Sequence, residues 1–282
     1  MTASAAGSLG SLVQDYVDVQ CDVILESRTA IDARDEDAVH PVRVAIRRLR
    51  ATLTTFGGVY RRVDRESLAQ EAKWAGLLLG DVRDLQVLAE RFAAESPSEA
   101  VGEVIEADIA RRRAEAWRAV IDGLDGARGV ALFAQLERWR DDPPFSDKAE
   151  RPADGALPRI EKADKRVRSR LKRARAAAAS DDDDAAELLH DARKAAKRHR
   201  YAVELARPVL GADADRTIEE RQALQDALGA HQDAVVALAF LRAIDVSAQD
   251  AATTRQMGTL IDRTRDSADD VAGVLRDAQH AS

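Results

Sequence analysis

The chain has 282 residues and a formal net charge of −7, and 45% of its residues are hydrophobic and 33% charged. A chain of this length can bury a sizeable core, and its acidic balance disfavours broad nonspecific attraction to nucleic acid or anionic membranes. Aromatic residues make up only 4%, so the composition favours helices that pack through small and aliphatic side chains.

The N-terminal segment, MTASAAGSLGSLVQDYV, lacks the basic start and apolar core of a signal peptide. No later run approaches the roughly 18 apolar residues of a membrane span. Cys21 is the single cysteine, so the chain forms no internal disulfide and does not need an oxidising compartment. We therefore expect a cytoplasmic protein that does not contact membranes.

Helical periodicity runs along the whole sequence, and sustained strand alternation is nearly absent. Glycine and proline breaks at 57–58, 80–81, 96–97, 123–129 and 208–211 separate the helical segments. We therefore expect an all-α fold. Helices are predicted over 9–31, 38–57, 63–80, 83–95, 98–122, 128–140, 157–179, 184–208, 213–229, 231–245 and 250–279.

A proline-rich segment at 140–158 marks the boundary between two similar halves. Gly80 and Asp84 of the first half correspond to Gly229 and Asp233 of the second, 149 positions later. Duplicated helical units predict two pseudo-symmetric bundles that face one another. We expect a single domain over 9–279, with a first helical repeat at about 9–140, a linker at about 141–157 and a second repeat at about 158–279.

The strongest internal repeat is a pair of basic segments, HPVRVAIRRLR at 40–50 and HDARKAAKRHR at 190–200. On a helix, positions i, i+3, i+7 and i+10 lie within an arc of about 80°. A histidine and three cations therefore share one helix face in each segment. These residues are His40, Arg43, Arg47 and Arg50 in the first segment, and His190, Arg193, Lys197 and Arg200 in the second.

Like charges stacked in this way destabilise a helix by roughly a few tenths of a kcal/mol per pair. A bound polyanion would supply the missing negative charge, and the planar donors of arginine suit phosphate oxygens. A basic face that is merely solvated is the alternative, but the duplication at equal spacing favours a ligand. Arg48, Lys194 and Arg198 lie beside the arc and widen the basic surface.

Other polar residues near these segments have two interpretations each. Tyr201 falls on the basic side, where it either packs or donates a hydrogen bond to a ligand. Asp84 and Asp233 each follow a glycine-containing turn, which favours helix N-caps or partners of arginines over catalytic acids.

At these motifs the sequence resembles the conserved histidine α-helical domain family, CHAD. The resemblance rests on HPVRVAIRRLRATLTTF, LLLGDVRDLQVL, LLHDARKAAKRHRYAVEL and LQDALGAHQDAVVAL, in that order, and spans about residues 9–279. It implies two four-helix-bundle repeats around a basic central channel that binds inorganic polyphosphate. It also implies an association with bacterial polyphosphate granules.

The resemblance further implies which residues face the ligand. From the two basic segments these are His40, Arg43, Arg47, Arg48 and Arg50, with His190, Arg193, Lys194, Lys197, Arg198 and Arg200. Further candidates are Lys73, Arg83, Arg166, Arg170 and Arg173. The family interpretation requires no cofactor, metal or catalytic residue, so polyphosphate is the expected partner and hydrolysis is not expected.

Two other functions stay open. A metal-dependent phosphohydrolase would use His190 and Asp191 with His231 and Asp233, but such a short pattern is frequent by chance, and Asp191 points about 100° away from the basic face. Nucleic-acid binding would use the same basic faces. The scarcity of aromatic residues for base stacking and the acidic net charge argue against it.

Overall fold

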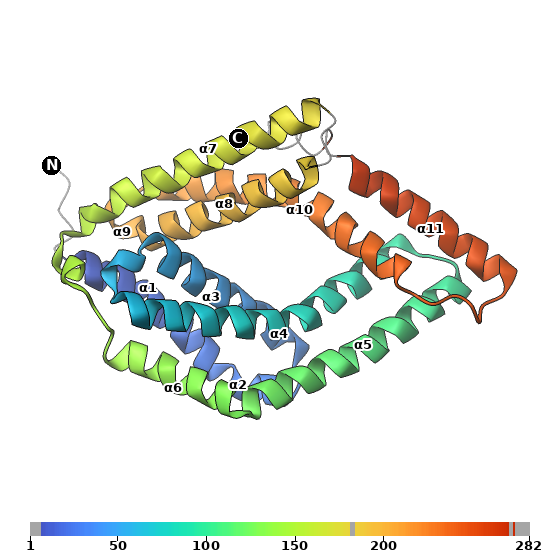
Figure 1. The fold of residues 1–282 in the computed structure, drawn as a ribbon, viewed down its shortest axis with the longest axis horizontal. Coiled ribbons are helices and arrows are strands. Elements are labelled where there is room, and N and C mark those ends of the chain that lie inside the picture. The colour runs from blue at the N-terminus through green and yellow to red at the C-terminus, as the bar shows by residue number, and fades with distance from the viewer. Residues whose placement is uncertain (1–6, 181–183, 271–272, 274–282) are drawn as a thin grey trace.

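The computed structural model describes residues 7–180, 184–270 and 273 (Figure 1). All regular elements among these residues are helical, which confirms the predicted all-α class. Two isolated bridges, Ser8 to Pro152 and Tyr60 to Phe145, tie the proline-rich segment to the first helices. No helix within the described ranges is long and apolar enough to cross a membrane.

The helices follow the predicted order, but the predicted helix 9–31 is divided at Ser27, and short 3₁₀ turns lie at the loops. The elements are α1 (Leu9–Glu26), α2 (Arg28–Asp32), α3 (Glu36–Thr55), η1 (Gly57–Val59), α4 (Arg62–Glu95), α5 (Glu99–Asp125), α6 (Ala127–Asp141), η2 (Asp147–Glu150), η3 (Ala153–Ala156), α7 (Leu157–Ala179), α8 (Ala185–Leu205), α9 (Arg207–Leu210), α10 (Asp213–Arg242) and α11 (Ala251–Asp269). The end of the last predicted helix, beyond Asp270, lies outside the described residues except for Gly273.

Two of the predicted helix breaks are wrong. The segments 63–80 and 83–95 form one continuous helix, α4, and the segments 213–229 and 231–245 form α10. Gly80 and Gly229 therefore lie inside helices, where glycine usually destabilises. The close approach of arginine side chains to both glycines accounts for their presence there.

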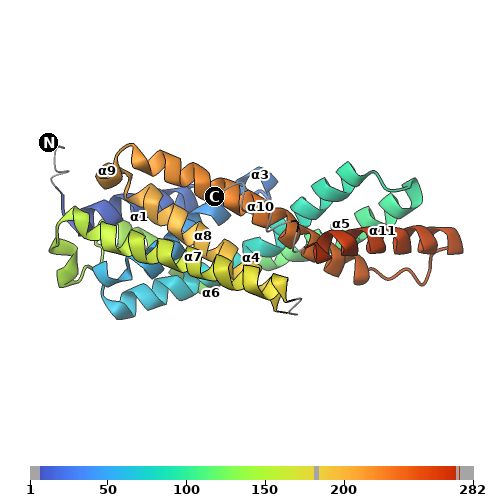
Figure 2. The ribbon, with the colours of Figure 1, turned by 90° about the horizontal axis from the view of Figure 1, so that it is seen from above.

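Two pairs of helices frame the middle of the molecule: α3 with α4, and α8 with α10 (Figure 1). At one end α3 approaches α8, where Arg48 Nε donates to Glu204 Oε2 over 3.0 Å. At the other end α4 meets α10, where the ring centroids of Phe92 and Phe240 lie 5.8 Å apart. Beyond this contact, α5 and α11 extend the molecule along its long axis (Figure 2).

Apolar contacts hold each pair in place. On α3, the stripe of Val39, Val42, Ile46 and Leu49 is buried against its neighbours, and none of these side chains is more than 3% exposed. On α8, alanines at 192, 195 and 196 pack against α7 and α10 in a second cluster. Burial of these stripes leaves the basic faces of α3 and α8 directed toward the space between the two pairs.

Candidate functional site

A cleft of about 730 Å³ lies between the pair α3 and α4 and the pair α8 and α10. We call it the basic cleft. The described residues that line it include two histidines, His40 and His190, and three acids, Asp84, Asp226 and Asp233. They also include seven cationic side chains: Arg43, Arg47, Arg83, Arg91, Arg193, Lys197 and Arg200.

The two duplicated basic segments meet in this cleft. From α3 it receives His40, Arg43 and Arg47, and from α8 it receives His190, Arg193, Lys197 and Arg200. Arg47 is close enough to Arg193 and Lys197 to lower the pKa of both. The structure therefore brings seven of the eight residues predicted to share the two faces into one site, from both sides.

Lys197 is the cleft residue whose pKa is shifted furthest from its ordinary value. Burial lowers its pKa to about 7, and the positive charges of Arg193, Arg47 and Arg200 contribute to this shift. Asp233 opposes it only in part. An anion in the cleft would favour the charged ammonium and raise the pKa of Lys197 again.

Burial also lowers the pKa values of two of the cleft arginines, Arg43 and Arg193. The Nη1 atom of Arg43, the Nε atom of Arg47 and the Nε atom of Arg193 are buried and form no hydrogen bond to another protein atom in the described chain. Their charge is thus incompletely compensated within the protein. Such clusters are costly to fold and attract anions.

Both cleft histidines have pKa values below the ordinary range. For His40, burial is the main cause, followed by the charges of Arg83, Arg47 and Arg43. For His190, burial again acts most strongly, followed by Lys194 and Arg193. Neutral imidazoles in the free cleft can still hydrogen bond to phosphate, and a bound anion would promote their protonation.

Several residues of the predicted ligand-facing set do not line the basic cleft. Lys194 pairs with Asp191 at 2.7 Å, and Arg170 pairs with the same carboxylate from α7. Arg48 pairs with Glu204 at 3.0 Å. The residues of the predicted set that lie outside the cleft are Arg48, Arg50, Lys73, Arg166, Arg170, Arg173, Lys194 and Arg198.

Tyr201 lines the cleft but is buried, with 3% of its surface exposed. Its ring lies under two guanidinium groups, 5.0 Å from that of Arg200 and 5.7 Å from that of Arg48. Glu204 joins the same group, since it accepts a hydrogen bond from Tyr16 at 2.9 Å and pairs with Arg200 at 3.4 Å. The ring of Tyr201 thus packs within this group, and a hydrogen bond from Tyr201 to a ligand stays a prediction.

The N-cap interpretation of Asp84 and Asp233 is wrong, because both lie inside helices, whereas the arginine-partner interpretation is confirmed for Asp84. Asp84 lies inside α4, and its Oδ1 atom is 3.4 Å from Nη2 of Arg43. Arg91, also on α4, is a cleft residue that sequence reasoning missed. Positions 84, 87, 88 and 91 share one helix face and all lie in the predicted helix 83–95, so their spacing from Asp84 could have indicated Arg91.

Of the residues considered for a phosphohydrolase, His190 and Asp233 line the cleft, but Asp191 and His231 do not. Asp191 is engaged by Arg170 and Lys194 outside the cleft. His231 is 5% exposed and lies near the backbone of Ala268, on the side of α11. Among the described residues, no group of three histidine, cysteine or acidic side chains is arranged to hold a metal ion.

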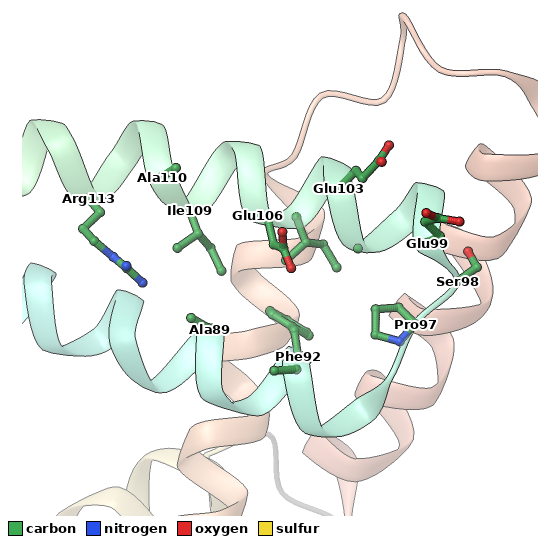
Figure 3. Close-up of a pocket in the computed structure, with 13 residues that line it drawn as sticks. Ala89, Phe92, Pro97, Ser98, Glu99, Glu103, Glu106, Ile109, Ala110 and Arg113 are labelled. Carbon is green, nitrogen blue, oxygen red and sulfur yellow. The ribbon is translucent and has the colours of Figure 1, made fainter.

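A second hollow, of about 780 Å³, lies between the end of α4 and the start of α5. Phe92 and Ile109 point into the space between these helices (Figure 3). Glu99, Glu103 and Glu106 line it, and Arg113 is the cation among its described lining residues. The excess of carboxylates in this hollow repels polyanions, so the basic cleft is the candidate site for an anionic ligand.

Residues 16–242 match the family described as the CHAD domain. Two uncharacterized proteins from Mycobacterium tuberculosis, of strains CDC 1551 and H37Rv, are each 30% identical to the chain over 232 residues. These matches cover 79% of the chain and 44% of each relative. The chain thus spans less than half the length of the curated relatives that it matches.

Two solved structures are similar to this one. PptA from Streptomyces chartreusis has a TM-score of 0.78 and 18% identity, with 98% of this chain and 100% of that chain covered. The crystal structure of the CHAD domain from the plant Ricinus communis has a TM-score of 0.76 and 22% identity, with 99% and 94% covered. At these identities the likeness shows a shared fold.

Proposed function

The chain belongs to the CHAD domain family, and on that premise we propose that it binds inorganic polyphosphate in the basic cleft without acting on it. The main support for this proposal is that seven described cations from two facing helix pairs line one cleft. A linear polyphosphate is a thin, flexible anion with a charge on each phosphate. It can contact α3 and α8 at the same time.

The electrostatics of the cleft support this proposal. The guanidinium groups of Arg47 and Arg193, whose Nε atoms have no hydrogen-bond partner in the described chain, gain acceptors and countercharge when phosphates enter. Counterions leave the polymer at the same time, so the affinity is expected to fall steeply as salt rises. No cofactor is part of the proposal.

Polyphosphate fits the cleft better than nucleic acid does. Tyr201 is the one phenylalanine, tyrosine or tryptophan among the described lining residues, and it is buried beneath two arginines. It offers no open ring face on which a base could stack. The carboxylates of Asp84, Asp226 and Asp233 further restrict the positive surface to a narrow path.

Binding of long-chain polyphosphate across a salt series tests the proposal. The variant Arg47→Ala/Lys197→Ala removes one cation from each side of the cleft. We expect its affinity to fall on the order of a hundredfold and its log–log salt slope to become shallower by about 1.5. The control Arg62→Ala/Lys148→Ala removes the same charge from exposed positions outside the cleft.

The control is expected to bind nearly as well as the wild type. Equal losses in both double variants would mean that total charge, not the cleft, governs binding. Failure of the folded wild type to bind would reject the proposal. Metal-dependent release of phosphate that is lost in His190→Ala would instead favour the hydrolase interpretation.

Within a bacterial cell, we expect this binding to bring the protein to polyphosphate granules. A fluorescent fusion of the wild type should co-localise with granules, and the fusion of Arg47→Ala/Lys197→Ala should be dispersed. Equal granule localisation of both fusions would show that a partner other than polyphosphate recruits the protein.

A further inference from the structure

Gly80 lies against the guanidinium group of a cleft arginine. A Cβ atom added at Gly80 would lie 2.7 Å from Nη1 and 3.8 Å from Cζ of Arg43. The first distance is shorter than real Cβ contacts, so any other residue at position 80 has to displace the end of this side chain. The absence of a side chain at Gly80 therefore lets the guanidinium group rest directly on the backbone of α4.

The second half of the chain contains the same contact. At Gly229, inside α10, an added Cβ atom would lie 3.3 Å from Nη2 of Arg193 and 3.8 Å from its Cζ and Nε atoms. Arg43 and Arg193 are corresponding positions of the two basic segments. The same residue pair thus meets in both halves, on different helices.

An acid follows each glycine by four residues. Asp84 Oδ1 lies 3.4 Å from Nη2 of Arg43. Asp233 opposes the burial that lowers the pKa of Arg193, so it lies within electrostatic reach of that guanidinium group. On a helix, residues four apart lie on the same face. Each guanidinium group therefore has a flat backbone surface beneath it and a carboxylate nearby on the same helix face.

We infer that Gly80 with Asp84, and Gly229 with Asp233, are positioning residues that hold Arg43 and Arg193 in the orientation that receives phosphate. The inference rests on the proposed function and specifies how two of the cleft cations are prepared for it. A free arginine side chain loses much rotamer freedom when it binds a ligand. An arginine side chain that is already held loses less rotamer freedom. The glycine and aspartate residues therefore increase the affinity although they do not contact the polymer.

The test compares Gly80→Ala with Arg43→Ala and with the double variant in long-chain polyphosphate binding at fixed salt. We expect Gly80→Ala to weaken binding about tenfold, as Arg43→Ala does, because the added methyl group shifts the guanidinium group. In the Arg43→Ala background, adding Gly80→Ala should change nothing further, because the glycine acts through that side chain. Gly229→Ala should have a smaller effect, because its contact is looser.

Gly258→Ala is the matched control, because Gly258 lies inside α11 and a Cβ atom there meets nothing within 4 Å. This variant should bind as the wild type does. Thermal unfolding of all variants checks the fold, and alanine at helix positions 80 and 258 favours the helix. The atom displaced at position 80 is the flexible end of a side chain, so the helix itself is preserved.

The outcomes separate this inference from the proposed function. If Arg43→Ala weakens binding but Gly80→Ala binds as the wild type does, polyphosphate binding stands and the positioning role is rejected. A further loss from Gly80→Ala in the Arg43→Ala background would also reject it, since the glycine would then act by another route. If the wild type does not bind, the proposed function fails and the inference fails with it.

Discussion

Lys197 is the cleft residue whose charge changes near neutral pH. Its pKa is lowered to about 7, chiefly by burial and then by Arg193 and Arg47. Above this pH the free cleft holds a neutral amine, whereas a bound polyanion favours the ammonium form. Binding therefore takes up a proton, and the affinity depends on pH in the range above pH 7.

We expect polyphosphate affinity to fall above pH 7, by at most about tenfold per pH unit. Arginine stays charged throughout this range, so Lys197→Arg should remove most of the pH dependence. Titrations between pH 6.5 and 8.5 at constant ionic strength measure both slopes. An unchanged slope in Lys197→Arg would assign the proton to another group.

Sequence reasoning located seven of the described cleft-lining residues because they share one face on each of two similar helices. It failed at Arg50, which lies at the predicted position around the axis of α3 but does not line the cleft. The contact of Arg48 with Glu204 shows why, since α3 and α8 converge at this level and the cleft ends before Arg50. Helix periodicity defines the face of a residue, but not the point at which a neighbouring helix closes that face.

At the scale of elements, a buried polar contact joins α7, α8 and α10. His199 Nδ1 accepts a hydrogen bond from Arg221 Nε at 3.1 Å, and Arg221 Nη2 lies 2.8 Å from Asp164. His199 is 3% exposed, and burial lowers its pKa to about 4. The charges of Arg221 and Arg168 contribute to the shift, and Asp164 opposes it.

This contact predicts a loss of stability in acid. The folded pKa of His199 lies below the ordinary histidine value of about 6.5, so the unfolded chain binds the proton more readily. Stability therefore falls as pH drops from about 6.5 toward about 4, by on the order of 2 kcal/mol for this residue. Urea unfolding at pH 7 and pH 4.5 should show a smaller difference for His199→Gln than for the wild type. Equal differences would exclude His199 as a source of the acid sensitivity.

Helix boundaries were predictable where local signals and packing agree, as in α7, whose ends match the predicted 157–179. They were not predictable at Gly80 and Gly229, because glycine inside a helical pattern usually indicates a break. Here tertiary contacts with Arg43 and Arg193 account for the glycines, and both helices continue through them. The pairing of the two halves into pseudo-symmetric repeats stays a prediction.

At the scale of the whole molecule, charge is segregated. The net charge is −7, whereas the described cleft lining carries seven cationic side chains against three acids. A strongly charged, narrow polymer can enter the cleft, whereas the rest of the chain carries the excess of acids, which disfavours broad binding of bulkier polyanions. This arrangement favours selectivity over broad binding.

Competition between ligands tests this selectivity. At matched salt, long-chain polyphosphate should displace a labelled single-stranded oligonucleotide from the protein, and the oligonucleotide should displace polyphosphate poorly. The expected reason is the buried position of Tyr201, whose ring is not open to stacking by a base. Stronger binding of the oligonucleotide would favour the nucleic-acid interpretation.

The most direct test of the central claim is a structure of the protein with a polyphosphate of defined length. The account predicts phosphates in the basic cleft, within hydrogen-bond distance of Arg47 on α3 and Lys197 on α8. Phosphates bound only along the outer basic residues of α7, such as Arg166 and Arg173, with no phosphate in the cleft, would contradict it.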